Sequence, residues 1–216
     1  MNMPVIDARY GWQPADLDRV IEVLRAGELA VIPTDTVYGI AANADDPDAV
    51  SKLLAAKGRG KQMPPPVLVS GGDAIDDLCV NVPATARRLA QSHWPGGLTL
   101  ILQARSDLGW DLGQTHGTLA LRMPDHRCTL ELLDQTGPLA VTSANLTGQE
   151  PATSLTEAIQ AFGHKVGAYV DAGPTPGTTP STIIDLAHGQ PRAIRLGTLS
   201  LEELSSSAGE VILPAD

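Results

Sequence analysis

The stretch "LAVIPTDTVYG", residues 29–39, passes from an apolar run into a polar turn. Its first four residues are aliphatic and predict a short buried strand, which Pro33 ends. The preceding residues 16–26 carry apolar side chains at i, i+3, i+4 and i+7, which predicts a helix that stops at Gly27. A helix followed by a strand that ends in hydroxyl and carboxyl side chains is typical of an α/β sheet with a ligand at its strand ends.

Helical and strand patterns alternate through most of the chain. Asp46 followed by Pro47 predicts a helix start, and short aliphatic runs predict buried strands. The later strands have no helices between them, so we expect a mixed sheet. We find no internal repeat and expect one domain over residues 1–216. The expected helices are 16–26, 46–57, 84–93, 125–134 and 155–162, and the expected strands are 29–32, 66–70, 98–102, 118–123, 139–142, 169–170, 182–185 and 193–196.

Charge and composition limit what the protein does. The chain has 216 residues, a net charge of -10 and only 3% aromatic residues. These values argue against broad binding to nucleic-acid backbones and against base-stacking platforms. There is no basic leader and no apolar run approaching 18 residues, so we expect a cytoplasmic protein that does not enter a membrane. The histidines and cysteines lack metal-binding spacing, and we expect no metal site built from protein ligands.

Residues 57–61, "KGRGK", place three cations in one Gly-rich segment of an acidic chain. This pattern predicts an anion site, because Gly58 and Gly60 let the backbone approach a ligand while the cations surround it. It is not a P-loop, since Ala55 and Gln62 stand where that motif needs Gly and Ser or Thr. A solvated charge run at the end of a helix is an equally good interpretation. In either case we expect a solvated loop that contributes little stability.

Two polar turns follow strands elsewhere in the chain, "TDT" at residues 34–36 and "TSAN" at residues 142–145. Both supply hydroxyl, carboxyl or amide groups that orient a small polar substrate. Each is also explained by local bonds from a side chain to the backbone in a turn. Ser143 lacks the Gly-x-Ser-x-Gly context of an activated nucleophile, so we do not interpret it as one. Only the order and the strand-end context of the segments favour a shared site.

Taken in order, these segments resemble the YrdC/Sua5 family, the threonylcarbamoyl-AMP synthases. The likeness runs from about residue 14 to residue 200. The set is specific, although each piece alone is not. The matching segments are "PTDTVYG" at 33–39, "KGR" at 57–59, "WPGGLT" at 94–99, "SAN" at 143–145 followed by "TG" at 147–148, "GPT" at 173–175, "STIID" at 181–185, and Arg195.

The resemblance implies a twisted, mixed sheet of the YrdC type, with flanking helices and a concave positive cavity. It implies a nucleotidyltransferase that joins L-threonine, bicarbonate and ATP into threonylcarbamoyl-AMP and pyrophosphate, with Mg²⁺ accompanying ATP. The product would serve tRNA-modifying transfer proteins that act on adenosine 37. By the same resemblance, the catalytic residues are Lys57, Arg59, Ser143 and Asn145. ATP would contact Lys57, Arg59, Lys61, Thr118, Asn145, Thr153 and Arg195, and threonine would contact Thr34, Arg122, Ser143 and Ser181.

Three further expectations accompany this set. Thr118 lies on the same strand face as Ala120 and Arg122, so we expect it in the same cavity. Asp35 is expected to orient Thr34 or neighbouring cations rather than to act on substrate. Residues 173–180, rich in Gly, Pro and Thr, are expected to form a surface loop or lid.

Two departures from the family pattern and two further functions stay open. Gly60 stands where the family usually has Pro, and Met63 replaces a small polar residue or His. A module that contacts tRNA or double-stranded RNA is a second interpretation, against which the net charge argues. A carbamoyl-adenylate module of the hydrogenase-maturation type is a third. The zinc-finger-like and acylphosphatase segments of those longer proteins do not occur here.

Overall fold

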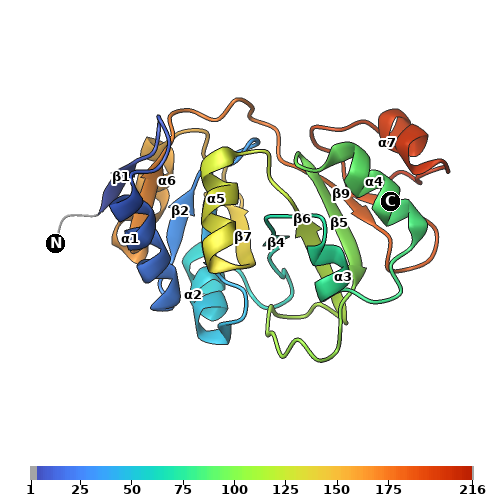
Figure 1. Ribbon diagram of the computed structural model, residues 1–216, viewed down its shortest axis with the longest axis horizontal. Helices are drawn as coiled ribbons and strands as arrows, with labels where there is room; N and C mark the ends of the chain where they lie inside the picture. Colours follow the sequence, from blue (N-terminus) through green and yellow to red (C-terminus); the bar gives the residue numbers. More distant parts are fainter. Residues whose placement is uncertain (1–3, 216) are drawn as a thin grey trace.

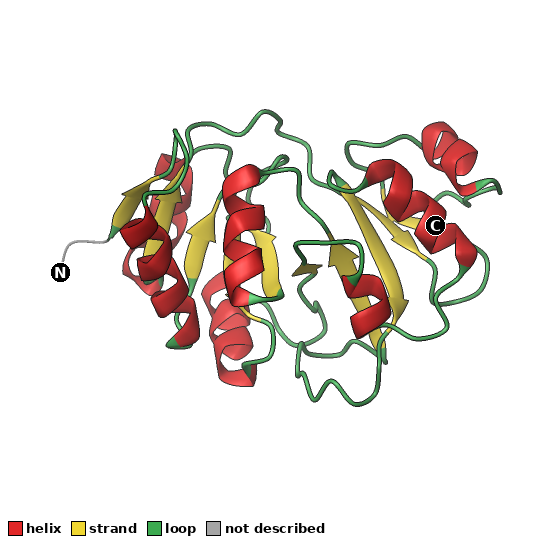
Figure 2. Cartoon of the chain, in the orientation of Figure 1, coloured by secondary structure: helices red, strands yellow, loops and turns green. Residues whose placement is uncertain are grey.

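The computed structural model describes residues 4–215 (Figure 1). Short strands and helices alternate along the chain (Figure 2). The strands are β1 (Val5–Asp7), β2 (Ala30–Ile32), β3 (Gly39–Asn43), β4 (Val67–Leu68), β5 (Leu98–Gln103), β6 (Thr118–Arg122), β7 (Leu139–Ser143), β8 (Ala168–Asp171), β9 (Thr182–Asp185) and β10 (Arg192–Arg195). The helices are α1 (Pro14–Arg25), α2 (Pro47–Lys57), α3 (Ala74–Leu78), α4 (Ala84–His93), α5 (Arg127–Thr136), α6 (Leu155–Phe162) and α7 (Leu201–Ala208), with a 3₁₀ turn at Gly163–Lys165.

All ten strands belong to one sheet in the order β1-β8-β2-β3-β7-β4-β6-β5-β9-β10. Parallel pairing joins β1 to β8, β8 to β2, β4 to β6 and β5 to β9. The remaining neighbours are antiparallel. The structure thus confirms the expected mixed α/β sheet. None of the helices within residues 4–215 is long and apolar enough to cross a bilayer.

The sheet has a hydrophobic core on each face. In β2, Val31 packs in the larger core, while Ala30 and Ile32 pack in the smaller one, as alternating side chains in a strand must. Helices α1 and α5 pack against each other, and their apolar residues share the smaller core with residues of β2, β7 and β8. Helices α2, α4 and α6 bury their apolar faces in the larger core on the other side. Helix α4 lies against β5, whereas α2 and α6 contact β3 and β8. The part of the sheet from β1 to β7 is therefore buried on both faces.

The β5–β6 half differs on the α1–α5 face. Leu98, Leu100 and Leu102 of β5 all point into the larger core. The intervening Thr99 and Ile101 instead line a cavity. No helix of the smaller core reaches this part of the sheet (Figure 1). The fold thus leaves one stretch of sheet free to line a ligand cavity.

Most helices fall where the sequence predicts them. Asp46 caps α2 by accepting from two backbone N–H groups, and Gly58 ends that helix in the left-handed conformation with φ 67°. Helices α4 and α6 match their expected ranges, and α1 and α5 are shifted by two residues at their starts. Strand β4 is shorter than the expected 66–70.

Besides the 3₁₀ turn, four elements were not expected: β1, β3, α3 and α7. Strand β3 has the sequence "GIAAN", whose Gly and Ala residues have low strand propensity. It forms because it pairs on both sides, with β2 and β7. Its Gly39 has no room for a side chain, since a Cβ there would lie 2.6 Å from Val141 Cγ1. Tertiary packing therefore overrides local propensity in this segment.

Candidate functional site

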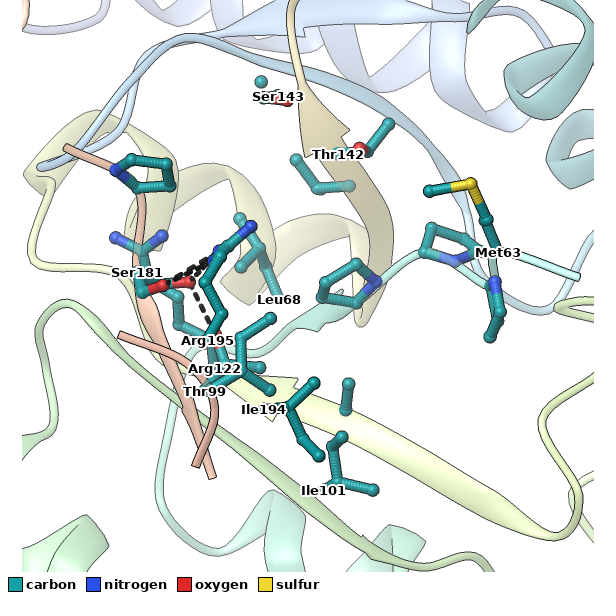
Figure 3. A pocket seen from close by; sticks show the side chains of 18 of the residues that line it. Met63, Leu68, Thr99, Ile101, Arg122, Thr142, Ser143, Ser181, Ile194 and Arg195 are labelled. Carbon is teal, nitrogen blue, oxygen red and sulfur yellow. Dashed lines mark hydrogen bonds between the residues drawn. The ribbon is translucent and has the colours of Figure 1, made fainter. Parts of the chain in front are cut away.

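A cavity of about 360 Å³ opens over the free part of the sheet. Side chains from the 34–39 turn, the loop after α2, and strands β5, β6, β7, β9 and β10 line it (Figure 3). Its lining contains three arginines and no aspartate or glutamate. The predicted site residues that line it are Thr34, Arg59, Thr118, Arg122, Ser143, Ser181 and Arg195.

Arg122, at the end of β6, has a side chain that is 8% exposed. Its Nε donates to the Gly96 carbonyl, and its terminal nitrogens donate to Thr36 Oγ1 at 3.0 Å and Asp35 Oδ1 at 2.6 Å. Burial lowers the pKa of Arg122, and the Asp35 carboxylate opposes that shift. A guanidinium carries five N–H groups, so one on each terminal nitrogen stays available to a ligand. Asp35 orients this cation, as the sequence led us to expect.

Arg195 and Ser181 lie together on the β9–β10 side of the cavity. The Arg195 guanidinium donates to the Ser181 carbonyl and hydroxyl, and that hydroxyl also bonds to Thr99 Oγ1 at 2.9 Å. Burial lowers the pKa of Arg195, and repulsion from Arg122 and Arg59 lowers it further. Arg122 and Arg59 are therefore both close enough to repel the Arg195 guanidinium, and an anionic ligand would relieve that repulsion.

Arg59 follows α2 and is half-buried at the cavity wall. One terminal nitrogen donates to Thr142 Oγ1 at 3.0 Å. Its Nε is buried without a hydrogen-bond partner, the one side-chain atom of this kind in the described chain. Burial lowers the pKa of its guanidinium. A buried donor without an acceptor is costly, so this group is prepared for an oxygen ligand.

Thr34 combines both roles that the sequence left open. Its hydroxyl donates to the Val37 carbonyl at 2.6 Å and accepts from the backbone N–H groups of Thr36 and Val37. These are the bonds of a side-chain-stabilised turn. The residue also lines the cavity. The turn thus fixes Thr34 where it can meet a ligand.

Two further hydroxyl residues stand at the cavity. Thr118 lies on the β6 face shared with Ala120 and Arg122, and all three line the cavity, which confirms the expectation from strand periodicity. Its hydroxyl donates to the Thr115 carbonyl at 2.7 Å. Ser143, at the end of β7, also faces the cavity (Figure 3).

Lys57 corrects one expectation. The side chain is not part of a solvated loop, because the residue is only 1% exposed. It does not line the cavity either. Its ammonium donates to the carbonyls of Ser143 and Asn145 and to Asn145 Oδ1. Burial, with some repulsion from Arg59, lowers its pKa to about 7. In this structure Lys57 joins the end of α2 to the turn after β7.

Asn145 is buried in the same turn, outside the cavity lining. Its amide nitrogen donates to the Leu146 and Gln149 carbonyls at 2.9 and 2.8 Å. Together with the Lys57 contact, these bonds fold the 143–149 turn. Asn145 borders a second, separate pocket beside α6.

Thr153 and Lys61 also stand away from the cavity. The Thr153 hydroxyl and backbone N–H donate to Glu157, a residue of the α6 capping box. Lys61 is exposed and forms an ion pair with Asp111 at 2.7 Å. The structure therefore does not bring Lys57, Lys61, Asn145 and Thr153 to the cavity wall.

Residues 173–180 are tied down at their start. The hydroxyl of the buried Tyr38 donates to the Gly173 carbonyl at 2.6 Å and accepts from Ala172 N–H. Thr175 N–H donates to the Thr153 carbonyl at 2.9 Å. Farther along, Pro180 and Ser181 line the cavity. The segment therefore connects anchored residues near Tyr38 to the cavity wall.

Three cavity threonines whose hydroxyls bond to predicted site residues were missed as site residues: Thr36, Thr99 and Thr142. Thr36 bonds to Arg122, and Thr99 bonds to Ser181. Thr142 bonds to Arg59. Each lies inside or next to a motif segment, in "TDT", "WPGGLT" and "TSAN". Their position inside or next to a motif segment was the sequence feature that could have identified them as site residues. Which hydroxyl meets which arginine depends on strand pairing.

Comparison with known proteins agrees with the geometry. The Sua5/YciO/YrdC family model, described as "Telomere recombination", matches residues 22–197. The chain belongs to the Sua5/YciO/YrdC family. Its mixed sheet with helices on both faces matches the fold of the Sua5 structures of this family.

Among relatives in this family, a protein of Mycobacterium tuberculosis, provisionally named a threonylcarbamoyl-AMP synthase, is 45% identical over 88% of this chain and 87% of its own length. The crystal structure of Pyrococcus abyssi Sua5 complexed with L-threonine superposes with a TM-score of 0.88 and 33% identity. That match covers 97% of this chain and 62% of the Pyrococcus chain. Escherichia coli YciO, at 22% identity, shares the fold with a TM-score of 0.83 over 94% of this chain and 98% of its own.

Proposed function

We propose that the protein is a nucleotidyltransferase that forms threonylcarbamoyl-AMP and pyrophosphate from L-threonine, bicarbonate and ATP. The observation that carries this proposal is the convergence of Arg59, Arg122 and Arg195 on a cavity without carboxylates. Such a cavity suits substrates that together bring a triphosphate, a carboxylate and a carbamate. The names of the relatives and the threonine complex of Pyrococcus Sua5 support the same reaction.

The threonine carboxylate is assigned to Arg122. Asp35, Thr36 and the Gly96 carbonyl fix the guanidinium plane and leave one N–H on each terminal nitrogen. A planar pair of donors matches the two oxygens of a carboxylate. Ser181 and Thr34 stand on the same cavity with hydroxyls fixed by neighbouring groups. The Ser181 hydroxyl provides a polar contact for the rest of the amino acid. The Thr34 hydroxyl is already bonded within its own turn, so Thr34 contributes such a contact only if the ligand replaces one of those bonds.

The ATP phosphates are assigned to Arg59 and Arg195. Arg59 offers its unpartnered Nε, and Arg195 is repelled by both other arginines. Thr118 and Ser143 add hydroxyls on the same wall. Lys57 and Asn145 act on ATP by holding the turn that carries Ser143. Lys61 and Thr153 complete the nucleotide contacts only if ATP draws their segments toward the cavity.

The reaction then proceeds in two steps. The threonine amine adds to the carbon of bicarbonate, and water leaves, which gives a carbamate. A carbamate oxygen bonds to the α-phosphorus of ATP as the bond to the bridging oxygen breaks. Pyrophosphate leaves with that electron pair. The arginines hold the reactants in line and offset the charge that grows on pyrophosphate, so no covalent intermediate with the protein is needed.

Magnesium enters this proposal with ATP. Within residues 4–215, no group of three His, Cys, Asp or Glu side chains is placed to hold a metal ion. The cavity lining also lacks carboxylates. Mg²⁺ commonly uses substrate phosphates and water as ligands, so the triphosphate itself would hold it. The ion would supply further neutralisation of phosphate charge.

The wider role follows from the product. Threonylcarbamoyl-AMP is a mixed anhydride, so a transfer protein must consume it, and we propose tRNA-modifying partners acting in the cytoplasm. Direct contact with tRNA or double-stranded RNA is a separate, weaker proposal. No described feature favours it over the enzyme, because the three arginines line a cavity rather than an open face.

Pyrophosphate release tests the proposed reaction. The purified protein is incubated with MgATP, and threonine and bicarbonate are omitted in turn. We expect release only when both are present, together with a product whose mass is that of threonylcarbamoyl-AMP. Equal release without threonine would contradict the assignment, and serine in place of threonine serves as a control for selectivity.

A further inference from the structure

Residues 104–117 form a long irregular connection between β5 and β6 (Figure 1). Connections longer than about 12 residues without secondary structure of their own are uncommon and are often functional. Leu108, Trp110 and Leu112 pack against the larger core at alternating positions of this connection. Leu112 and Thr115 also line the cavity. The connection is therefore fixed to the core on one side and borders the candidate site on the other.

The segment 60–65, which follows Arg59, forms a neighbouring part of the cavity wall but has few anchors of its own. Residues 60–63 are exposed, and Pro65 is the buried side chain of the segment. Within it, the Met63 N–H donates to the Gly60 carbonyl at 3.3 Å. Gly60 also lacks the backbone restriction that a Pro ring would give at this position. The position of this wall therefore depends on contacts outside the segment.

Residues 111–114 supply such a contact at Lys61. The Gln114 N–H donates to the Lys61 carbonyl at 2.7 Å. Asp111 pairs with the Lys61 ammonium through one carboxylate oxygen and accepts from the Gly113 N–H through the other. Both charged side chains are about half exposed, so their ion pair contributes little. The main-chain contact is therefore the one that holds the two segments together.

Gly113 makes this close approach possible. Its φ of 101° lies in the region that favours glycine, and a Cβ there would lie 2.5 Å from the Lys61 carbonyl oxygen. The atom that such a Cβ would meet belongs to the main chain, so it cannot rotate aside. Gly109, in the same connection, has a φ of 70° but open space where a Cβ would stand. The two glycines therefore separate backbone strain from contact with Lys61.

We propose that Gly113 is a positioning residue, which lets residues 111–114 clamp the segment 60–65 so that the cavity wall is formed before substrate arrives. The inference rests on the proposed function, because this wall adjoins Arg59, which is assigned to the ATP phosphates. Without the clamp the segment also occupies positions in which the wall is open. Only molecules with a formed wall then bind ATP, so the apparent Kd rises by the inverse of their fraction. ATP that is bound reacts at the normal rate.

Gly113→Ala tests the clamp, and Gly109→Ala is the matched control because it strains the same connection without touching Lys61. Steady-state pyrophosphate release gives kcat and the KM for ATP. Titration with inorganic tripolyphosphate and Mg²⁺ gives a Kd that needs no reaction. Hydrogen exchange at the Gln114 N–H reports whether its bond to the Lys61 carbonyl persists. Thermal unfolding followed by circular dichroism checks that each variant is folded.

We expect Gly113→Ala to raise the KM for ATP and the Kd for tripolyphosphate about 5- to 10-fold, which corresponds to a formed wall in roughly 10–20% of molecules. The kcat should stay within about 2-fold, because the bound state is unchanged. Exchange at Gln114 should be faster, and Gly109→Ala should change none of these quantities. If Gly113→Ala does not fold, Gln114→Pro removes the same N–H donor and should give the same result.

Three outcomes would overturn the clamp. The first is an unchanged KM and Kd in a folded Gly113→Ala or Gln114→Pro variant. The second is an equal loss in Gly113→Ala and Gly109→Ala, or a fall in kcat alone, since backbone strain would then explain the effect. The third is tighter binding of tripolyphosphate, which would show that the contact holds Lys61 away from phosphate.

The binding measurement also distinguishes this inference from the proposed reaction. A wild-type protein that forms no threonylcarbamoyl-AMP, but whose Kd for tripolyphosphate still rises in Gly113→Ala, would contradict the reaction and keep the clamp. A protein that forms the product, with a KM for ATP that does not respond to Gly113→Ala, would keep the reaction and remove the clamp.

Discussion

The Asp35 carboxylate lies 2.6 Å from a terminal nitrogen of Arg122, and both side chains are largely buried. The same Asp35 oxygen accepts from the backbone N–H of Asp125, just before α5. Asp35 thus links the 34–36 turn, β6 and the segment leading into α5. Removing one partner of a buried ion pair lowers the free energy of unfolding far more than removing one partner of an exposed pair does. Its geometry sets how Arg122 faces the cavity.

Changing Arg122 to Lys should raise the threonine requirement more than the ATP requirement. An ammonium cannot reproduce the planar donors that Asp35, Thr36 and the Gly96 carbonyl hold in place. We expect the KM for threonine to rise roughly 10-fold or more, in line with the loss of a charge-assisted hydrogen bond. Steady-state pyrophosphate release with each substrate varied measures this. A larger rise in the KM for ATP would show that Arg122 binds phosphate instead.

Lys57→Ala and Arg59→Ala should differ in stability. Removing the Lys57 ammonium leaves buried carbonyl oxygens of the 143–145 turn without a donor, so we expect the free energy of unfolding to fall by about 2–3 kcal/mol. Arg59 has a buried Nε without a partner, so its removal should cost less than about 1 kcal/mol. Turnover of Arg59→Ala should nevertheless fall roughly 10²-fold. Urea unfolding and turnover are measured on both variants. Equal stability losses would contradict the distinction.

Lys57 should also make stability depend on pH. Its folded pKa is lowered to about 7, mainly by burial, whereas the unfolded chain keeps the ordinary value of 10.5. Between these values the unfolded state binds more protons at this site, so the free energy of unfolding rises with pH. Below pH 7 the site is protonated in both states and the penalty for its buried charge is fully present.

Comparison with Lys57→Met isolates this contribution. The difference in free energy of unfolding, wild type minus variant, should increase between pH 7 and pH 9. Urea unfolding at several pH values measures it, and other titrating groups cancel in the difference. A difference that stays flat would mean that the carbonyl acceptors keep the ammonium charged throughout.

The segment 173–180 should act as a lid that pivots on its Tyr38 anchor. The Tyr38 hydroxyl pairs with both Gly173 and Ala172, so Tyr38→Phe leaves a carbonyl and an N–H without their partner. We expect faster hydrogen exchange in this segment in the variant. In the wild-type protein, threonine with a non-hydrolysable ATP analogue should slow exchange there, because closure excludes water from the anhydride. Unchanged exchange with both ligands would identify a rigid loop.

Local sequence signals determined much of the fold. Asp46, Pro47 and Gly58 mark the two ends of α2 because capping and backbone conformation are properties of a few adjacent residues. Strand periodicity placed Thr118 with Arg122 for the same reason. Strand β3 could not be predicted in this way, since its Gly and Ala residues form a strand only between β2 and β7. Its stability comes from partners distant in sequence.

The candidate site likewise combines features that adjacent residues determine with features that depend on distant parts of the chain. The order of the motif segments, set by the sequence alone, indicated the family. The resemblance predicted Arg59, Arg122 and Arg195 as site residues, and all three line one cavity. The sequence did not reveal that Lys57 is buried and bonded to the 143–145 turn, or that a bulge turns Ile194 toward the cavity. Both depend on strand pairing and burial between segments far apart in the chain. The sequence gives the chemical type of each side chain directly. The burial and the neighbours of that side chain depend on packing between segments distant in the sequence.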